Sequence, residues 1–431
     1  MKKKILCGLF AAASVASLAS CGGGKDVFHI YAWNDEFKGF FDKYVSDQKE
    51  AGLESYTYEG KEVKWTIVPN EGTAYQDAVD LALKNNAKAS KEDKVDMFLA
   101  EADYIKKYAD ASVTQDVTKI GVTDFTNIYN YTKEAASDAN GVVKGVSFQC
   151  CPSGLIYNRT IAKDVLGTDD PTLVGAALDS WAKFDAVALA AKAKGYYMTA
   201  CDAETYRVFS NNAASAWVDS TGTIKIPAVV QEWMDQADKY VKNEYTIAAD
   251  VWSDAKTATI AKGKETALCC FGPAWYYNFC MGGSESGDWG LVAGPQSHFW
   301  GGTWLLAATG ADDTELVAKV MNAFINDEEV CTNLIKNDGQ FTNNQKVNKA
   351  VAESKDYAGN AFLGGQNDTK VFLELAKNIK FQNTTIYDQY CNEQIQSCFR
   401  EYLNGTVTKD QAIANFYTAV TTKYANLKKP A

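Results

Sequence analysis

Apolar positions between residues 27 and 108 alternate between two spacings. Runs of β-branched and aromatic residues predict strands, and each is followed by a segment whose apolar residues recur every three or four positions, which predicts an amphipathic helix. Because strands that alternate with helices pair in parallel through right-handed crossovers, we expect an α/β sheet covered by helices. The expected strands are 27–33, 63–68 and 95–99, and the expected helices are 37–45, 73–83 and 102–108.

A second series of the same kind begins near residue 146. The chain then returns toward the first sheet through residues 299–304, where Gly301 and Gly302 allow a close approach of the backbone to a neighbour or ligand. Gly195 suits the left-handed position that follows a helix. The expected strands are 155–158, 196–201, 266–271 and 289–292, and the expected helices are 160–166, 181–194, one opening at Pro273, 313–326, 328–336 and several more to the C-terminus.

The turns after the predicted strands carry aromatic, carboxylate and amide side chains. Sheets of this kind bind ligands just beyond the carboxyl ends of their strands. Aromatic rings stack on the apolar faces of sugars, and carboxylates and amides pair with neighbouring hydroxyls. The same residues are also compatible with a core tryptophan and ordinary helix caps, so both interpretations stay open. The candidates are Trp33, Asn34, Glu36, Asn70, Glu71, Tyr75, Glu101 and Asp103 in the first series and Asp202, Arg207, Trp275, Tyr276 and Tyr277 in the second.

The first 24 residues have the pattern of an export signal. Three lysines precede an apolar run at 5–18 that is too short for a transmembrane anchor. The run ends in Leu18-Ala19-Ser20-Cys21, which resembles the bacterial lipobox, in which the cysteine is acylated, palmitate being one such chain. We expect a signal peptide at 1–20 and a lipidated, glycine-rich tether at 21–26, which places the protein on the outer face of the cell membrane. The alternative is an ordinary signal peptide beside an unmodified cysteine.

Length and charge exclude several classes of protein. A chain of 431 residues is too long for one hydrophobic core and suits two domains. It carries 43 Lys and Arg against 54 Asp and Glu, a net charge of −11, and losing the three signal lysines makes it more acidic. Nucleic acid and acidic phospholipid are therefore not expected partners. With 46% hydrophobic and 12% aromatic residues, the composition is typical of a compact folded protein.

Cysteine usage gives no sign of a metal or redox centre. Apart from Cys7 and Cys21 there are nine cysteines, an odd number, with no CxxC pair, and the chain has only two histidines. Adjacent cysteines such as Cys150 and Cys151 bridge only through a strained ring. We therefore expect mostly free, buried thiols and no metal or other cofactor.

Five segments in a characteristic order resemble one protein family. They are VFHIYAWNDEF, VDMFLAEADYIKKYADASVTQDV, QCCPSGLIYNRTIAKDVLGTDDP, WAKFDAVALAAKAKG and WGLVAGPQSHFWGGTWLLAATGADDTELVAKVMNAFI. The chain resembles the extracellular solute-binding proteins of carbohydrate ABC transporters, the group related to maltose-binding protein. Cys150 and Cys151 depart from the family pattern, where a polar or aromatic residue is common before the proline.

The resemblance implies an α/β, two-lobed clamp of the periplasmic-binding-protein type with hinge crossovers. Residues 25–148 and 299–345 would form the first lobe, and 152–295 and 346–431 the second. An oligosaccharide would close the lobes by contacting both, and transmembrane permease subunits would receive it from a monomer. The implied ligand contacts are Trp33, Asn34, Glu36, Glu71, Glu101 and Asp103 in the first lobe, Asp202, Arg207 and Trp275 in the second, and Trp300 or Trp304 near the hinge.

Two other functions suit part of the same pattern. A lipid-anchored glycoside hydrolase would also carry acids and tryptophans in a cleft, but it needs two carboxylates at a fixed spacing. The same clamp could instead bind a polyamine, whose charge suits acids and aromatic rings, or a peptide or metal. The chain has no GxSxG, HExxH or GxxxxGK[ST] motif, so we expect a binding protein without catalytic residues.

Overall fold

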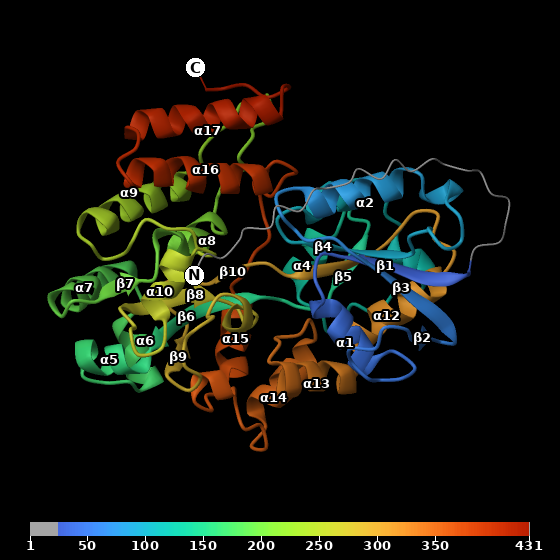
Figure 1. Ribbon diagram of the computed structural model, residues 1–431, viewed down its shortest axis with the longest axis horizontal. Helices are drawn as coiled ribbons and strands as arrows, with labels where there is room; N and C mark the ends of the chain where they lie inside the picture. The colour runs from blue at the N-terminus through green and yellow to red at the C-terminus, as the bar shows by residue number, and fades with distance from the viewer. Residues whose placement is uncertain (1–24, 431) are drawn as a thin grey trace, which may run out of the picture.

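The computed structural model describes residues 25–430, which form two sheets covered by helices (Figure 1). The first sheet contains β1 (Val27–Ala32), β2 (Thr57–Tyr58), β3 (Lys61–Ile67), β4 (Met97–Glu101), β5 (Gly145–Ser147) and β11 (Thr303–Ala307). The strand order is β2-β3-β1-β4-β11-β5. The predicted parallel pairing is confirmed for β1 with β3 and β4, whereas β11 arrives from a distant part of the chain and is antiparallel to β4 and β5.

Helices bury both faces of this sheet. They are α1 (Glu36–Tyr44), α2 (Ala74–Lys84), α3 (Ile105–Ala109), α4 (Asn130–Ala135), α12 (Thr314–Asn326) and α13 (Glu328–Asp338), with the short turns η1 (Asn86–Lys88) and η2 (Val117–Ile120). Successive side chains of a strand point to opposite faces. In β4, Leu99 joins the core cluster that includes residues of α1 and α12, and Phe98 joins the cluster that includes residues of α2 and α3. Burial on both sides explains the continuous apolar run of β4.

The second sheet is mostly antiparallel. It contains β6 (Pro152–Asn158), β7 (Tyr197–Thr199), β8 (Ala267–Gly272), β9 (Trp289–Val292) and β10 (His298–Phe299). Its order is β10-β6-β8-β7, and β9 also pairs with β6. Only β7 and β8 are parallel among these pairs. Its helices are α5 (Arg159–Leu166), α6 (Pro171–Ala177), α7 (Trp181–Ala193), α8 (Tyr206–Ser210), α9 (Ala228–Lys242), α10 (Asp254–Ile260) and α11 (Tyr276–Phe279), with η3 (Asp202–Thr205).

Two local predictions in this half have different outcomes. Gly195 follows α7 with φ 85°, so the predicted left-handed position is confirmed. Pro273 does not open a helix. The N–H of Tyr276 donates to the Pro273 carbonyl at 3.0 Å, which closes a turn, and α11 begins only at Tyr276.

Most of the C-terminal helices extend the half that contains the second sheet, whereas α14 also packs against α13 of the first half. The C-terminal helices are α14 (Gln345–Glu353), α15 (Asp368–Ala376), α16 (Asp388–Leu403) and α17 (Lys409–Lys423), with η4 (Ala361–Leu363). Trp233 of α9, Phe399 of α16 and Phe416 of α17 belong to one buried cluster, and the three helices lie stacked at the upper left of Figure 1. The lobe boundaries given above stay a prediction.

Three crossing segments connect the two sheets and lie against one another. The Cys150 N–H donates to the Phe341 carbonyl at 3.2 Å, and the Trp300 N–H donates to the Cys151 carbonyl at 3.2 Å. These bonds tie the connections together at the base of the space between the sheets. The segments are residues 148–151, 299–302 and 340–343.

All nine cysteines of the described residues are buried and unpaired, as expected. Burial raises the pKa of Cys150 and Cys151 well above the usual thiol value, so both stay neutral. Within residues 25–430, no group of three His, Cys, Asp or Glu side chains is arranged to hold a metal, and no helix has the length and apolar character of a membrane span. The predicted signal peptide and Cys21 lie outside the described residues.

Candidate functional site

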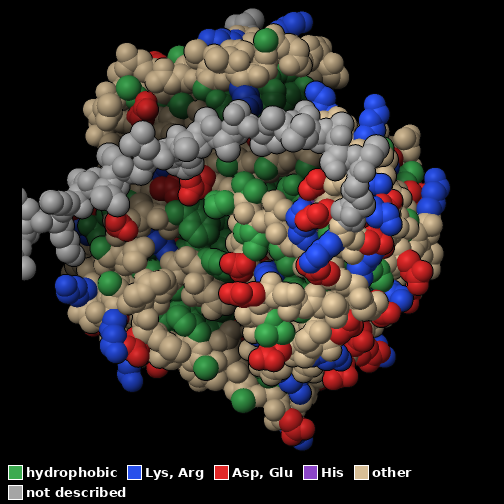
Figure 2. All heavy atoms as spheres, turned by 45° about the vertical axis from the view of Figure 1, so that its right-hand side comes forward, with side chains coloured by type: hydrophobic (Ala, Val, Ile, Leu, Met, Phe, Trp, Pro, Cys, Tyr) green, Lys and Arg blue, Asp and Glu red, His purple; other side chains and the backbone are tan. Residues whose placement is uncertain are grey.

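A cleft of about 590 Å³ separates the two sheets, and side chains from both sides line it. Figure 2 shows hydrophobic side chains gathered in a hollow on one face of the molecule, with acidic side chains beside them. The cleft lies at the carboxyl ends of β1 and β4, the position expected for a parallel sheet. Eight of the predicted contacts line it: Trp33, Asn34, Glu36, Glu101, Asp103, Arg207, Trp275 and Trp300.

Three predicted contacts do not line the cleft. Glu71 is exposed in the turn after β3, where its neighbour Asn70 faces the cleft instead. The Asp202 carboxylate is buried, accepts the Ala249 N–H at 2.8 Å and pairs with the cleft residue Arg400 at 3.3 Å, so it lies behind the cleft wall. Trp304 is only 2% exposed, and its Nε1–H donates to the Thr132 carbonyl at 2.9 Å. The structure therefore places Asp202 and Trp304 in the interior.

The sequence analysis missed several residues of the cleft wall. Trp252 and Phe279 contribute aromatic surface from loops and from α11, where no predicted strand end marks the position. A further group comes from the polar face of α16, which begins 89 residues after the last strand of the second sheet. Amphipathic spacing signalled a helix there but not which neighbour its polar face meets. These α16 residues are Gln389, Glu393, Gln396, Ser397 and Arg400.

Three tryptophans form an aromatic wall in the cleft. The rings of Trp252 and Trp275 are nearly parallel, at 6° with centroids 6.3 Å apart, and Trp300 meets Trp275 edge-on at 5.1 Å. The Trp275 Nε1–H also donates to the Trp300 carbonyl at 3.2 Å. Trp252 is 59% exposed, so one broad apolar face is open to a ligand. We call Trp252, Trp275 and Trp300 the tryptophan wall.

Gly301 makes the close packing of this wall possible. Its φ is 73°, a conformation that side chains other than hydrogen disfavour, and an added Cβ would lie 3.2 Å from Trp275 Nε1. The paired glycines predicted a close approach at this crossing segment, and the structure confirms it.

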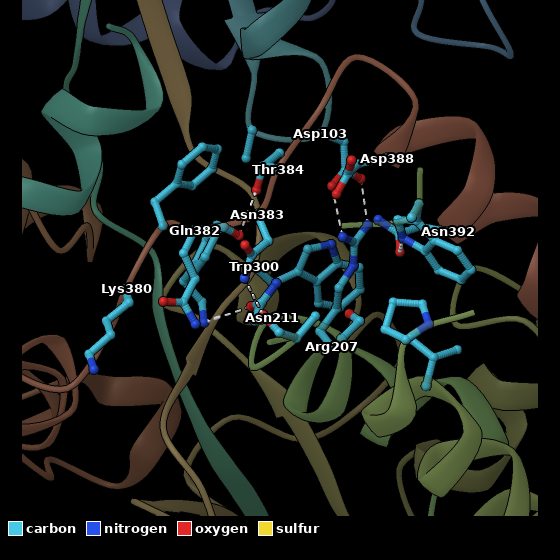
Figure 3. Close-up of a pocket in the computed structure, with 18 of the residues that line it drawn as sticks. Asp103, Arg207, Asn211, Trp300, Lys380, Gln382, Asn383, Thr384, Asp388 and Asn392 are labelled. Atoms are coloured by element: carbon cyan, nitrogen blue, oxygen red, sulfur yellow. Dashed lines mark hydrogen bonds and ion pairs between the residues drawn. The ribbon is translucent and has the colours of Figure 1, made fainter. Parts of the chain in front are cut away.

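An ion pair joins the two halves across the cleft. Arg207 of α8 donates from Nη1 to Asp103 Oδ1 at 2.7 Å and from Nη2 to Asp103 Oδ2 at 2.5 Å, and Asp103 follows β4 of the first sheet (Figure 3). Although burial opposes the charged form, the Asp103 carboxylate raises the pKa of Arg207 above its usual value. The side chains are 15% and 22% exposed. Gln76 of α2 makes a second bridging bond, donating to Gln389 of α16 at 2.8 Å.

Three carboxyl groups in and beside the cleft hold protons unusually tightly. Burial raises the pKa of Glu36 to about 7, although Gln149 and Gln340 donate to it. Burial and the neighbouring Asp103 raise the pKa of Glu101, and burial raises that of Asp388 to about 7. A protonated carboxyl donates one hydrogen bond and accepts others, as a sugar hydroxyl does. These acids therefore bring less negative charge to the cleft than their number indicates.

We expect the free energy of unfolding to fall between pH 6.5 and 8. Glu36, Glu101 and Asp388 bind protons more tightly in the folded state than in the unfolded chain, so their contribution is lost as pH rises through the folded pKa values. The two buried histidines are neutral in the folded state, where burial lowers their pKa to about 4, but they are about half protonated in the unfolded chain at pH 6.5, so they offset part of this fall. The expected loss is on the order of 1–3 kcal/mol. Urea unfolding at both pH values measures it.

In the Glu36→Gln variant the free energy of unfolding should fall less over this pH range, because one of the three tightly bound protons is absent. The control Glu374→Gln, on the exposed surface, should show the same fall as the wild-type protein. A free energy of unfolding that stays constant or rises between pH 6.5 and 8 would contradict the tight proton binding.

Comparisons with known proteins place the chain among binding proteins. A family model described as bacterial extracellular solute-binding protein matches residues 54–362, whereas no curated protein matches the chain. A solved extracellular solute-binding protein of family 1 is 17% identical, with 92% of this chain and 98% of that chain covered and a TM-score of 0.73.

Two further solved structures share the fold and carry sugars. The ABC transporter associated binding protein from B. animalis subsp. lactis Bl-04, in complex with β-1,6-galactobiose, is 16% identical, with 95% and 100% of the chains covered and a TM-score of 0.68. The galacto-N-biose-/lacto-N-biose I-binding protein from Bifidobacterium longum, in complex with lacto-N-biose, is 14% identical, with 94% and 98% covered and a TM-score of 0.65. The predicted α/β fold with two lobes is confirmed.

Proposed function

Since this chain belongs to the family of bacterial extracellular solute-binding proteins, we propose that its solute is an oligosaccharide, which it captures outside the cell and delivers to the permease of an ABC importer. The family resemblance noted in the sequence is confirmed by the match over residues 54–362.

The tryptophan wall carries the proposal. An exposed indole face beside polar side chains suits a sugar ring, which has an apolar face and a rim of hydroxyls. Opposite the wall, Glu36, Glu101 and Asn34 offer donors and acceptors from the first half. Two structural neighbours were solved with disaccharides, which supports the same class of ligand here.

A polyamine is a weaker candidate for the same cleft. A cation needs carboxylates that are ionised and free to face it. The Arg207 guanidinium already occupies both oxygens of Asp103, and the raised pKa values of Glu36 and Glu101 reduce their charge at neutral pH. The cleft is therefore better suited to a neutral ligand with hydroxyl groups.

Catalysis is not part of the proposal. The family and the structural neighbours are binding proteins, and a glycoside hydrolase needs an acid and a second carboxylate placed on either side of the scissile bond. We expect the ligand to leave the protein unchanged, because Glu36 is held by two glutamines and Asp103 by Arg207.

We expect at least one member of an oligosaccharide panel to raise the melting temperature of the purified protein. A ligand that binds only the folded state stabilises it by about 2.7 kcal/mol at a hundred times its Kd. The panel should include β-1,6-galactobiose, lacto-N-biose and longer α- and β-linked glucans, with spermidine as the cationic control. Chromatography of the recovered ligand after hours of incubation should show no shorter product. Turnover that disappears in Glu101→Gln would favour the glycoside hydrolase.

We further propose that the mature chain begins at Cys21, and that lipid on this cysteine holds the protein, as a monomer, at the outer face of the cell membrane. The motif Leu18-Ala19-Ser20-Cys21 after an apolar run motivates this proposal. Replacing Cys21 by alanine should release the protein from the membrane fraction or leave the precursor uncleaved. Intact-mass measurement of the native protein checks it, and an unmodified mature Cys21 would contradict the anchor.

A further inference from the structure

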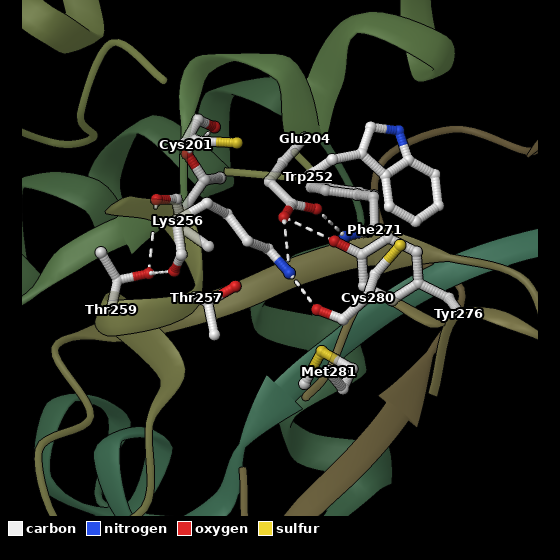
Figure 4. Close-up of polar contacts among 12 residues, drawn as sticks. Cys201, Glu204, Trp252, Lys256, Thr257, Thr259, Phe271, Tyr276, Cys280 and Met281 are labelled. Carbon is white, nitrogen blue, oxygen red and sulfur yellow. Dashed lines mark hydrogen bonds and ion pairs between the residues drawn. The ribbon is translucent and has the colours of Figure 1, made fainter. Parts of the chain in front are cut away.

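A fully buried ion pair lies behind the tryptophan wall. The Lys256 Nζ is 3.8 Å from Glu204 Oε1, and neither side chain is exposed. Neither residue lines the cleft. Figure 4 shows the Lys256 ammonium pointing between the Glu204 carboxylate and the Cys280 carbonyl, to which it donates at 2.5 Å. The proposed function assigns this pair no role.

Stability alone does not explain a charge pair in this position. Removing two charges from water costs about as much as their attraction returns, so a packed apolar pair of similar volume is often equally stable or more so. Burial raises the pKa of the neighbouring thiols of Cys201, Cys270 and Cys280, so they are neutral, and Glu204 supplies the negative charge that faces Lys256. The pair is therefore better explained by the contacts it holds in place.

Glu204 ties two segments together through hydrogen bonds. Its Oε2 accepts the N–H of Phe271 at the end of β8 at 2.8 Å, and its Oε1 accepts the hydroxyl of Tyr276 in α11 at 2.7 Å. Lys256 adds the third segment, α10, and its ammonium lies 4.9 Å from the centroid of the Tyr276 ring. One carboxylate and one ammonium thus join η3, the β8–α11 turn and α10.

Each of these three segments carries a cleft side chain a few residues away. Trp275 directly precedes Tyr276, Trp252 precedes Lys256 by four residues, and Arg207 follows Glu204 by three. The parallel stacking of Trp252 on Trp275 and the reach of Arg207 to Asp103 both depend on how these segments sit relative to one another. A shift of any one segment moves its cleft side chain with it.

We infer that Glu204 and Lys256 are positioning residues for ligand binding: without touching the ligand, they hold the tryptophan wall and Arg207 in the arrangement that the cleft requires. The inference rests on the proposed function only for the identity of the ligand. It predicts that removing both charges together harms binding more than folding.

The test compares the apolar double variant Glu204→Leu/Lys256→Met with the wild-type protein. Either single change leaves one charge buried and unpaired, so each single variant should melt at a lower temperature. The double variant should regain most of the wild-type melting temperature but bind the best oligosaccharide of the panel at least tenfold more weakly. The matched control is Lys61→Met/Asp313→Leu, which removes a partly buried pair at the far end of β3 from the cleft and should leave affinity unchanged.

A second readout needs no ligand. The coupled indoles of Trp252, Trp275 and Trp300 should give a near-ultraviolet circular dichroism signal that changes in the double variant and not in the control. If sugar binds the wild-type protein, an equal affinity in the double variant would overturn the inference. If no sugar binds the wild-type protein, an unchanged circular dichroism spectrum in the double variant would overturn it. Absence of sugar binding by the wild type would count against the proposed function alone.

Discussion

Replacing Trp275 by alanine is expected to weaken oligosaccharide binding about 5- to 150-fold. Trp275 packs against both Trp252 and Trp300 in the cleft wall, so its loss removes stacking surface directly and also frees the exposed Trp252 ring from its parallel neighbour. Aromatic stacking together with the burial of this area is worth on the order of 1–3 kcal/mol. Calorimetric titration with the best ligand of the panel measures the change.

Trp181→Ala is the matched control for this variant. The Trp181 ring stacks on Phe209 at 4.7 Å and 17°, and its Nε1–H also has a partner in the protein, but it does not line the cleft. Its loss should lower the melting temperature and leave the Kd unchanged. If Trp275→Ala behaves in the same way, Trp275 belongs to the core and the second half contacts its ligand elsewhere.

A larger effect is expected from Arg207→Ala. The Arg207 guanidinium gives two hydrogen bonds to Asp103 across the cleft, so its removal leaves a largely buried carboxylate unpaired and breaks a direct link between the two halves. Truncating one partner of such a pair costs about 2–5 kcal/mol. Because the pair forms in the closed state, which holds the ligand, this cost corresponds to roughly a 30-fold or larger loss of ligand affinity. Small-angle X-ray scattering should also show a larger radius of gyration for the variant.

The control removes an ion pair that stays within one half. Lys239 and Asp185 form an exposed pair at 2.7 Å in the second half, and Lys239→Ala should change neither the Kd nor the radius of gyration. Raising the salt concentration should have little effect on the wild-type closed state, because a partly buried pair is weakly screened. An Arg207→Ala variant with wild-type affinity and wild-type radius would show that closure does not depend on this bond.

The site residues that the sequence predicts best are those that follow the strands of the first sheet. Trp33, Glu101 and Asp103 were predicted together because the carboxyl ends of parallel strands meet at one edge, and the structure places them in the cleft. The same argument wrongly predicted Asp202 as a ligand contact. Asp202 follows β7 as predicted, but its side chain turns inward to the Ala249 N–H. A strand end predicts where a residue lies, but the nearest free donor decides where its side chain points.

Other parts of the site depend on contacts between distant segments. The resemblance implies Trp300 or Trp304 as a ligand contact near the hinge, yet alternation along β11 turns the Trp304 ring into the core, where Leu306 lies on the same face. Trp252 follows no strand, and the polar face of α16 meets the cleft only because α16 packs on α9. No local pattern contains that information. The ion pair of Glu204 and Lys256 is of the same kind, since its partners come from three separate segments.

The central claim is that an oligosaccharide is held between the two halves by side chains of both. A crystal structure of the protein with the best ligand of the panel tests it most directly. We predict a sugar ring stacked on the tryptophan wall, with hydroxyls bonded to Glu36, Glu101 or Asn34 from the first half and to Arg207 or α16 from the second. A ligand bound outside the cleft, or one that contacts a single half while the other stands open, would contradict the account.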